Sequence, residues 1–321
     1  MTRANSESWV APGTRAFDVL ALGEPLIEFN QVQTEPPMYL QGFGGDTLNA
    51  MIAAARAGAK TAYLTRLGQD RWADALQRLF ESEGVDTRGL RRLEGQRTGL
   101  YFVHHDRDGH HFSYARAGSA ASGMGLDDVR GAWLPLIADS HWLHLSGISM
   151  AVSESARQAA FLAMQLARES GTRVSLDTNL RLSLWPLDLA RKTLTDAFAA
   201  CDLLLPSLDD VIHLSGLSSA EANLDWCHTH GARTVVLKMG AQGAWVSHQG
   251  QRLHIEGRIV DAVDATGAGD CFGGNLLARL VQGDTLPEAS RWANAAASLA
   301  VQGHGAIAPL PSAAQVRAAL S

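Results

Sequence analysis

The chain has 321 residues, 46% of them hydrophobic and 19% charged, which is the composition of an ordinary globular protein. Its 27 basic and 33 acidic side chains give a formal net charge of −6 without a long basic run, which argues against sequence-independent nucleic-acid binding. No apolar run reaches membrane-spanning length, and the isolated cysteines (Cys201, Cys227 and Cys271) lack CxxC spacing, as is typical of a reducing cytoplasm. We therefore expect a cytoplasmic protein that binds neither nucleic acid nor a membrane.

Residues 1–16 are polar around Pro12-Gly13 and contain no apolar core, so they predict a flexible N-terminal tail and not a signal peptide. From Phe17 onward, short β-type runs alternate with helical patterns, which predicts one domain over 17–321. The expected strands are Phe17–Leu22, Thr61–Leu67, His141–Gly147, Arg173–Asp177, Asp202–Leu205 and Thr234–Lys238. The expected helices are Thr47–Ala57, Ala73–Glu83, Glu154–Glu169, Leu187–Ala199, Ala220–His230, Cys271–Val281, Pro287–Gln302 and Ala313–Leu320. This alternation implies an α/β fold with a parallel sheet covered on both faces, whose ligands bind at the carboxyl ends of the strands.

Four short runs break the alternation and predict a second, smaller β-sheet. They are Leu26–Asn30, Met38–Leu40, Gly99–His105 and His110–Arg116, drawn from about 26–41 and 97–117. The last two are joined through Asp106-Arg-Asp-Gly109, and Asp-Gly is a strong hairpin signal. Such a sheet would serve as a lid or as a subunit contact.

Histidines flank the predicted hairpin turn at His104, His105, His110 and His111. Histidine is a common ligand of zinc and nickel, but neighbouring residues of a strand point to opposite faces, so only some of these side chains could converge on one ion. A solvated hairpin tip is the favoured interpretation, and the sequence leaves the role of these histidines open.

The segment Asp264-Ala-Thr-Gly-Ala-Gly-Asp270 directly precedes the helix expected at Cys271. Glycines 267 and 269 let backbone N–H groups turn towards one point at the start of that helix, which is a common arrangement for binding phosphate. A carboxylate at Asp270 would repel a static phosphate, but it would suit a base that takes a proton from an attacking hydroxyl. Asp270 could also simply favour the positive end of the helix dipole. The spacing matches neither a dinucleotide fingerprint nor a Walker A loop.

Together with four other segments, this stretch resembles the ribokinase-like (PfkB) sugar kinases from about Phe17 onward. The other segments are Gly42-Phe-Gly-Gly-Asp-Thr-Leu-Asn49, Asp177-Thr-Asn-Leu-Arg181 through Trp185, Val236-Leu-Lys-Met-Gly-Ala-Gln-Gly243 and Gly303-His-Gly-Ala306. The resemblance implies a three-layer α/β/α core with a β-sheet lid, ATP as phosphoryl donor, and Mg²⁺, with a monovalent cation as a further candidate. It also implies that Asp270 is the general base and that the amides of Gly267, Ala268 and Gly269 form the anion hole.

The resemblance extends to the binding residues. It assigns ATP to Asn179, Arg181, Ser207, Lys238, Gly240, Gly243, Gly267 and Gly269, with Arg181 also near the reacting groups and the substrate. It assigns the sugar to Gly44, Gly45, Asp46 and Asn49 beside Asp270. A plain hairpin turn is the alternative role for glycines 240 and 243. Where the family usually carries Asn-x-x-Glu near the metal, this chain has Ser207-Leu-Asp-Asp210, so Asp210 is expected to hold Mg²⁺ through water, with Asp209 a poorer fit by spacing.

The substrate prediction depends on the small sheet. Strand parity places Tyr114 and Arg116 on one face, and pairing across the hairpin would bring Tyr101 alongside. The stretch Tyr114-Ala-Arg116-Ala-Gly-Ser119-Ala is similar to that of 2-keto-3-deoxygluconate kinases, in which the arginine meets the sugar acid carboxylate. The stretch from Asn179 to Trp185 is similar too, although fructokinases share it. A structural salt bridge is the alternative role for Arg116.

The sequence thus predicts an ATP-dependent kinase that phosphorylates the C6 hydroxyl of 2-keto-3-deoxygluconate, forming a homo-oligomer through its lid. A fructokinase or another PfkB-type sugar kinase is the alternative. A non-catalytic sugar sensor is disfavoured, since a sensor has no need for a base at Asp270. A Rossmann-type dehydrogenase is disfavoured by the missing fingerprint.

Overall fold

The computed structural model describes residues 9–10, 13–106 and 109–321. Most of the predicted tail and the tip of the predicted hairpin, at 107–108, lie outside the described residues, as does the side chain of His110. None of the helices in the described ranges is long and apolar enough to cross a membrane.

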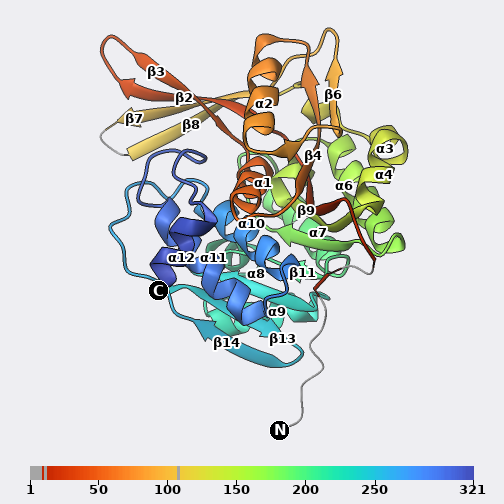
Figure 1. Ribbon diagram of the computed structural model, residues 1–321, viewed down its shortest axis with the longest axis vertical. Coiled ribbons are helices and arrows are strands. Elements are labelled where there is room, and N and C mark those ends of the chain that lie inside the picture. Colours follow the sequence, from red (N-terminus) through yellow and green to blue (C-terminus); the bar gives the residue numbers. More distant parts are fainter. Residues whose placement is uncertain (1–8, 11–12, 107–108) are drawn as a thin grey trace.

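A ten-stranded sheet runs through the centre of the described structure, in the order β14-β13-β12-β11-β10-β9-β1-β4-β5 with β6 paired to β4 (Figure 1). Its strands are β1 (Phe17–Leu22), β4 (Thr61–Gly68), β5 (Val85–Asp86), β6 (Leu90–Leu93), β9 (Ser140–Ser146), β10 (Arg173–Asp177), β11 (Leu203–Leu204), β12 (Thr234–Lys238), β13 (Ala244–His248) and β14 (Gln251–Ile255). All pairs are parallel except those of the β12–β13–β14 meander. The chain starts in the middle at β1 and winds outward in both directions, which makes the carboxyl ends of β1 and β9 the expected ligand crevice.

Helices cover both faces of this sheet and enclose two cores. The helices are α1 (Asp46–Arg56), α2 (Arg71–Ser82), α3 (Leu126–Asp128), α4 (Leu134–Ala138), α5 (Gly147–Ala151), α6 (Glu154–Glu169), α7 (Leu187–Phe198), α8 (Leu208–Ser215), α9 (Ala220–Thr229), α10 (Ala268–Val281), α11 (Leu286–Ala300) and α12 (Ala313–Leu320). Alternate residues of β1 supply the two cores: Val19 and Ala21 pack with α1, α10 and α11, while Leu20 and Leu22 pack with α6 and α7. The predicted α/β class is confirmed.

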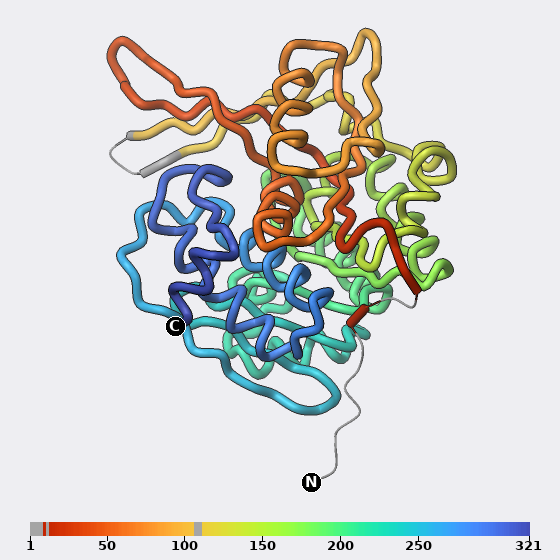
Figure 2. Tube along the Cα trace, viewed as in Figure 1, coloured from red at the N-terminus to blue at the C-terminus, as the bar shows by residue number. Residues whose placement is uncertain are grey.

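The second sheet has four strands in the order β3-β2-β7-β8 and projects beyond the core (Figures 1 and 2). Its strands are β2 (Leu26–Gln33), β3 (Met38–Gly44), β7 (Leu100–Asp106) and β8 (Gly109–Ala115). One face of this sheet packs against α2 through the ring of Phe29, which meets Trp72 edge-on at 5.4 Å between centroids. The opposite face carries Glu28. A Cβ added to Gly305, in the loop after α11 that closes the core (the closing loop, residues 303–306), would lie 4.0 Å from Oε1 of Glu28. This face therefore borders the closing loop of the core.

Two described parts of the predicted tail contact the core instead of extending loosely. Trp9 is buried, stacks on Trp142 at 6.3 Å, and accepts a hydrogen bond from the Trp142 indole on its carbonyl. Arg15 donates to the carbonyl of Ser170 at 2.9 Å. The tail prediction is therefore wrong for these two residues. A single tryptophan in a polar segment gives no periodic signal, which is why the sequence pattern did not identify the contact.

Candidate functional site

The N-terminus of α10 has the geometry of an anion site. Gly267 is its N-cap in the left-handed region (φ 75°), and no side chain caps the helix. An added Cβ at Gly267 would lie 3.2–3.3 Å from Ala306 in the closing loop, so both the backbone angle and the available space favour glycine. Of the predicted anion-hole amides, that of Ala268 already donates to the Ala265 carbonyl at 3.2 Å. An anion would compete with that turn for the Ala268 N–H.

Asp270 lies in the first turn of α10 and faces α1. Its Oδ2 accepts a hydrogen bond of 2.8 Å from the side-chain amide of Asn49. This contact depends on the close crossing of α1 and α10, because a Cβ on Gly274 would lie only 2.0 Å from the carbonyl oxygen of Ala50. Glycine at 274 thus lets the two helices bring an amide and a carboxylate together from distant parts of the chain.

A second carboxylate, Asp46, lies beside the first. It begins α1 and accepts a hydrogen bond from the hydroxyl of Ser146, the last residue of β9. The side-chain nitrogen of Asn179 is 3.5 Å from Asp46 Oδ2 and 3.5 Å from Asp270 Oδ1. Asn179 has φ 33°, a left-handed angle that asparagine tolerates better than most residues. One amide therefore lies between the buried carboxylate of Asp46 and the half-buried carboxylate of Asp270.

This environment shifts both acids towards the protonated form. Burial, followed by the negative charge of Asp46, raises the pKa of Asp270 to about 7. Burial also raises the pKa of Asp46, although the hydrogen bond from Ser146 and the charges of Arg116 and Arg181 act in the opposite direction. A carboxyl group with a pKa near neutrality can both accept and release a proton at neutral pH, as a general base must.

A cavity of about 880 Å³ opens beside Asp270. It is lined by the residues predicted for ATP: Asn179, Arg181, Ser207, Lys238, Gly240, Gly243, Gly267 and Gly269. Lys238, at the end of β12, pairs with Asp177 at the end of β10. A Cβ on Gly243 would lie 2.0 Å from the carbonyl oxygen of Ile255, so the β13–β14 region requires this glycine for its own packing, whatever it binds.

The carboxylates near the cavity suit a hydrated metal better than a protein cage. Asp210, in the first turn of α8, accepts hydrogen bonds on Oδ2 from the Thr178 hydroxyl (2.8 Å) and the Leu180 amide (3.2 Å). Burial, with the charge of Asp177 as a further cause, raises its pKa. Asp209 is exposed. Within the described residues there is no cluster of three or more acidic, histidine or cysteine side chains that could hold a metal, and Mg²⁺ usually keeps several waters and uses one or two carboxylates.

The small sheet brings three of the predicted sugar-side residues, Gly44, Tyr101 and Tyr114, next to one another. Tyr101 pairs with Tyr114 in the β7–β8 register, and their rings stack at 6.0 Å. The Tyr101 hydroxyl donates to the Glu28 carboxylate. A Cβ on Gly44 would lie 2.3 Å from that hydroxyl, so this glycine makes room for the tyrosine. Gly45 is the N-cap of α1, with φ 126°.

Arg116 is engaged within the protein. Its Nε donates to Glu24 Oε2 at 2.7 Å, and its Nη2 lies 2.5 Å from the same oxygen. The Ser119 hydroxyl donates to Glu24 Oε1 at 2.5 Å. The guanidinium lies 5.8 Å from the ring centre of Tyr114. The structural salt bridge that the sequence left open as the alternative role for Arg116 is therefore present.

The sequence reasoning missed Glu24, Glu28 and Ser146 as members of this network. Glu24 and Ser146 lie at or just beyond the carboxyl ends of β1 and β9, where ligands bind in such sheets. That position was the available signal. No sequence pattern identified Glu28, because an acidic residue in a short amphipathic strand predicts a side chain that faces solvent.

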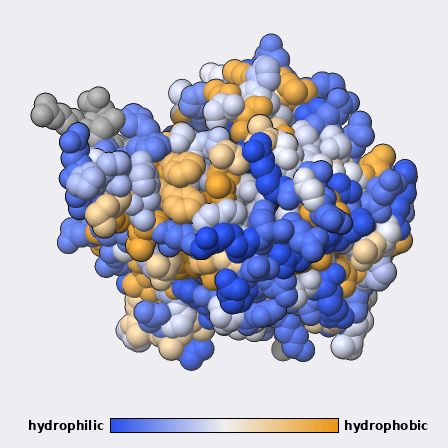
Figure 3. Space-filling view, turned by 90° about the horizontal axis from the view of Figure 1, so that it is seen from above, coloured by the Kyte–Doolittle hydropathy of each residue, from blue (hydrophilic) through white to orange (hydrophobic). Residues whose placement is uncertain are grey.

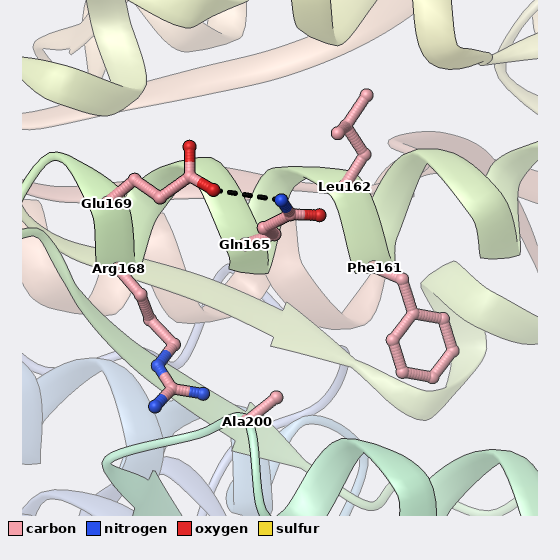
Figure 4. Close-up of a pocket in the computed structure, with 6 residues that line it drawn as sticks. All are labelled: Phe161, Leu162, Gln165, Arg168, Glu169 and Ala200. Carbon is pink, nitrogen blue, oxygen red and sulfur yellow. Dashed lines mark hydrogen bonds between the residues drawn. The ribbon is translucent and has the colours of Figure 1, made fainter.

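A second hollow lies on the surface of α6, well away from the cavity. Figure 4 shows its lining from Phe161, Leu162, Gln165, Arg168, Glu169 and Ala200. Gln165 donates to Glu169 at 2.8 Å, a pairing within one helix face. The hollow contains no nucleophile–base pair and no glycine-rich turn, so it does not compete with the site at α10.

The chain matches the model of the pfkB family of carbohydrate kinases over residues 16–313. It is 34% identical over 310 residues to a 2-dehydro-3-deoxygluconokinase of Thermoproteus tenax, covering 94% of this chain and 93% of that protein. Two solved structures bear on the site. A fructokinase from Xylella fastidiosa with bound ATP has a TM-score of 0.85 at 25% identity, covering 94% of this chain and 98% of that one. A fructokinase from Vibrio cholerae O395 with fructose, ADP and calcium has a TM-score of 0.83 at 28% identity and the same coverage.

Proposed function

Since the chain belongs to the pfkB family of carbohydrate kinases, we propose that it transfers the γ-phosphoryl group of ATP to the C6 hydroxyl of 2-keto-3-deoxygluconate. One observation carries the proposal: the half-buried carboxylate of Asp270 lies in the first turn of an uncapped helix, between a nucleotide-sized cavity and a cluster of polar side chains that contains Arg116. In this proposal the base, the anion site and the acceptor site meet at Asp270.

In this mechanism Asp270 takes the proton of the C6 hydroxyl as that oxygen attacks phosphorus. The O–P bond to the sugar forms, the bond to the β-phosphate oxygen breaks, and ADP leaves with its negative charge. Asn49 and Asn179 hold the carboxylate in place through their side-chain amides. Positioning and charge neutralisation supply most of the rate in such reactions, with the base adding about 10²–10⁴-fold.

The phosphates would lie against the amides of Gly267 and Gly269, with Lys238 and Arg181 on the cavity wall. Mg²⁺ would be held through water by Asp210, and it would neutralise charge on the β- and γ-phosphates. A monovalent cation remains a further candidate cofactor. Water is excluded if the small sheet closes over the site, with Gly42, Gly44 and Gly45 as the proposed hinge.

The sugar side supports a substrate rich in hydroxyl groups. Asn49 is 4% exposed, and its Oδ1 is buried without a hydrogen-bond partner. A buried acceptor of this kind is costly unless a ligand satisfies it, and a sugar hydroxyl would do so. Arg116 and Arg181 both lower the pKa of Asp46, so both cations lie near this carboxylate, although Arg181 also lines the nucleotide cavity. They support an acceptor with an anionic group.

A neutral ketose is the second candidate substrate, and one observation favours it. The Nε edge of Arg116, the edge best suited to a carboxylate, is already occupied by Glu24. A carboxylate would then have to bind at the Nη1 and Nη2 end of the guanidinium. The solved fructokinases with 25–28% identity are compatible with this alternative.

We further propose that two copies associate through the small sheet. The side chains of three large apolar residues in this sheet are exposed, by 62% at Val32, 52% at Met38 and 65% at Leu40. In the view from above, apolar side chains reach the molecular surface among hydrophilic ones (Figure 3). Exposed apolar side chains on a short sheet are typical of a surface that is covered in solution. Sedimentation of wild type and Leu40→Asp tests this: a monomeric wild type contradicts it.

The test of function is a coupled ADP-release assay with a panel of sugar acids and neutral sugars. We expect kcat/KM to be highest for 2-keto-3-deoxygluconate and the product to carry phosphate on C6. A higher value for fructose replaces the proposal with the fructokinase alternative. No turnover of any sugar, with ATP binding retained, would leave only a sensor role.

A further inference from the structure

Glu24 has no part in the mechanism above, yet it is among the most enclosed charged side chains in the described structure. Its side chain is 1% exposed. It lies in the connection between β1 and β2, at the carboxyl end of the central strand, where the chain passes from the core into the small sheet. A buried carboxylate is costly unless it is paired and hydrogen-bonded, so its partners indicate its purpose.

All of its side-chain partners come from the segment that leaves the small sheet. Oε2 accepts from Nε of Arg116 (2.7 Å) and lies 2.5 Å from its Nη2, while Oε1 accepts from the Ser119 hydroxyl (2.5 Å). Gly99, just before β7, completes the enclosure: a Cβ there would lie 2.5 Å from Glu24 Oε1. Glu24 therefore joins the points at which the chain enters and leaves the small sheet.

The pairing fixes the direction of the guanidinium. With Nε and one side of Nη2 bound to Glu24, the groups that remain for a ligand are Nη1 and the outer N–H of Nη2. The Tyr114 ring, 5.8 Å from the guanidinium carbon, further restricts its rotation. An arginine held in this way loses little conformational freedom when it binds a ligand carboxylate end-on.

We infer that Glu24 is a positioning residue for substrate selection: it holds Arg116 so that its free edge meets the carboxylate of a sugar acid. Glu24 acts through Arg116 and does not itself contact the substrate. The pairing also offsets most of the arginine's charge in the empty site, so that a closed lid would not leave an isolated buried cation. The inference rests on the proposed function, because it assigns Glu24 to acid selectivity.

The experiment is a double-mutant cycle on Glu24→Gln and Arg116→Leu, with kcat/KM measured for 2-keto-3-deoxygluconate and fructose. Glu24→Gln keeps the shape and one acceptor but removes the charge. We expect it to lower kcat/KM for the sugar acid about tenfold or more, mainly through KM, and to change fructose less than about threefold. In the Arg116→Leu background the same substitution should have no further effect on the sugar acid.

Two variants guard against a purely structural effect. Asp284→Asn breaks the Arg279–Asp284 pair (2.7 Å), which lies at the far end of α10, and should lower stability without changing the sugar preference. Ser119→Ala removes one anchor of Glu24 and leaves the ion pair, so it should give a smaller loss of the same selectivity. It replaces Glu24→Gln if that variant does not fold.

The outcomes separate the two proposals. Suppose that the wild type prefers the sugar acid, but that Glu24→Gln lowers kcat/KM equally for both substrates, or that its loss and the loss from Arg116→Leu combine independently in the double mutant. The inference about Glu24 is then overturned, and the proposed function stands. If wild type prefers fructose, the proposed function fails in the unmutated protein, and the selective role of Glu24 fails with it.

Discussion

The two sides of the proposed site around Asp270 differ in the groups that form them. The proposed donor side contains the glycine turns at Gly267 and Gly243, together with the ion pair between Lys238 and Asp177. The acceptor side consists of buried carboxylates and arginines that are already bound to one another, such as Glu24 with Arg116. A backbone site can bind the phosphates of any nucleotide, whereas a paired side-chain site changes with one substitution. The comparison suggests that donor use is fixed by the fold and acceptor choice by a few side chains.

The largest effect is expected where the two sides meet. Asp270→Asn removes the proposed base while keeping the shape, so kcat should fall by at least about two orders of magnitude with ATP binding retained. Steady-state kinetics with the preferred sugar measures it. A variant with near wild-type kcat would show that Asp270 is not the base.

A stability measurement shows that this loss does not come from unfolding. Burial raises the folded pKa of Asp270 to about 7, above its ordinary value in the unfolded chain, so folding favours the protonated form. Its stabilising effect is full below the unfolded pKa and is lost as pH rises through 7. Above pH 7 the charged carboxylate costs stability, and Asp270→Asn should therefore raise Tm at pH 8 but hardly at pH 4. An equal or lower Tm at pH 8 contradicts the pKa shift.

The next largest effect tests the acceptor side alone. Arg116→Leu should lower kcat/KM for the sugar acid roughly 10- to 150-fold, since a hydrogen bond to a charged group contributes about 1.5–3 kcal/mol. Fructose, measured in the same preparation, is the control, because any loss of folded protein lowers both sugars equally. If kcat/KM fell equally for both sugars, Arg116 would have only the structural role of pairing with Glu24.

A substitution on the donor side should have a weaker effect on kcat/KM, and the effect should not depend on which sugar is used. Gly267→Ala forces a left-handed N-cap (φ 75°) and a Cβ 3.2 Å from the Ala306 backbone, which should cost about 1–2 kcal/mol and lower kcat/KM for ATP about tenfold. Gly283→Ala is the matched control: it lies beyond the other end of α10 with φ 98° and nothing within 4 Å of the added Cβ. It should lower stability but not the use of ATP. If Gly267→Ala lowered kcat/KM for the sugar and left kcat/KM for ATP unchanged, the division into a donor side and an acceptor side would be contradicted.

The same division explains what the sequence could and could not predict. The donor side follows from local patterns, and the residues expected to bind ATP do line one cavity. The α/β class follows from the alternation, with strands such as Arg173–Asp177 and Thr234–Lys238 matching their predicted bounds. The ion pair of Glu24 with Arg116 joins residues 92 positions apart, and no local pattern specifies which charges will be buried together. α8 was missed because its eight residues are too few to give a clear helical period.

The smallest expected effect is a shift in pH dependence that connects the two sides. The charge of Asp46 is the second cause, after burial, of the raised pKa of Asp270. Because the base must be deprotonated, activity should rise with pH through about 7. Asp46→Asn removes the neighbouring negative charge, lowers the pKa of Asp270, and should move the acidic limb of the kcat/KM profile to lower pH by roughly one unit. Asp196→Asn makes the same change of net charge on the outer face of α7, where Asp196 pairs with Lys192 at 2.6 Å, and should leave the profile unchanged. An unshifted acidic limb in Asp46→Asn would mean that the charge of Asp46 does not set the proton affinity of the base, and would leave burial and the charge of Asp177 as the causes of the raised pKa.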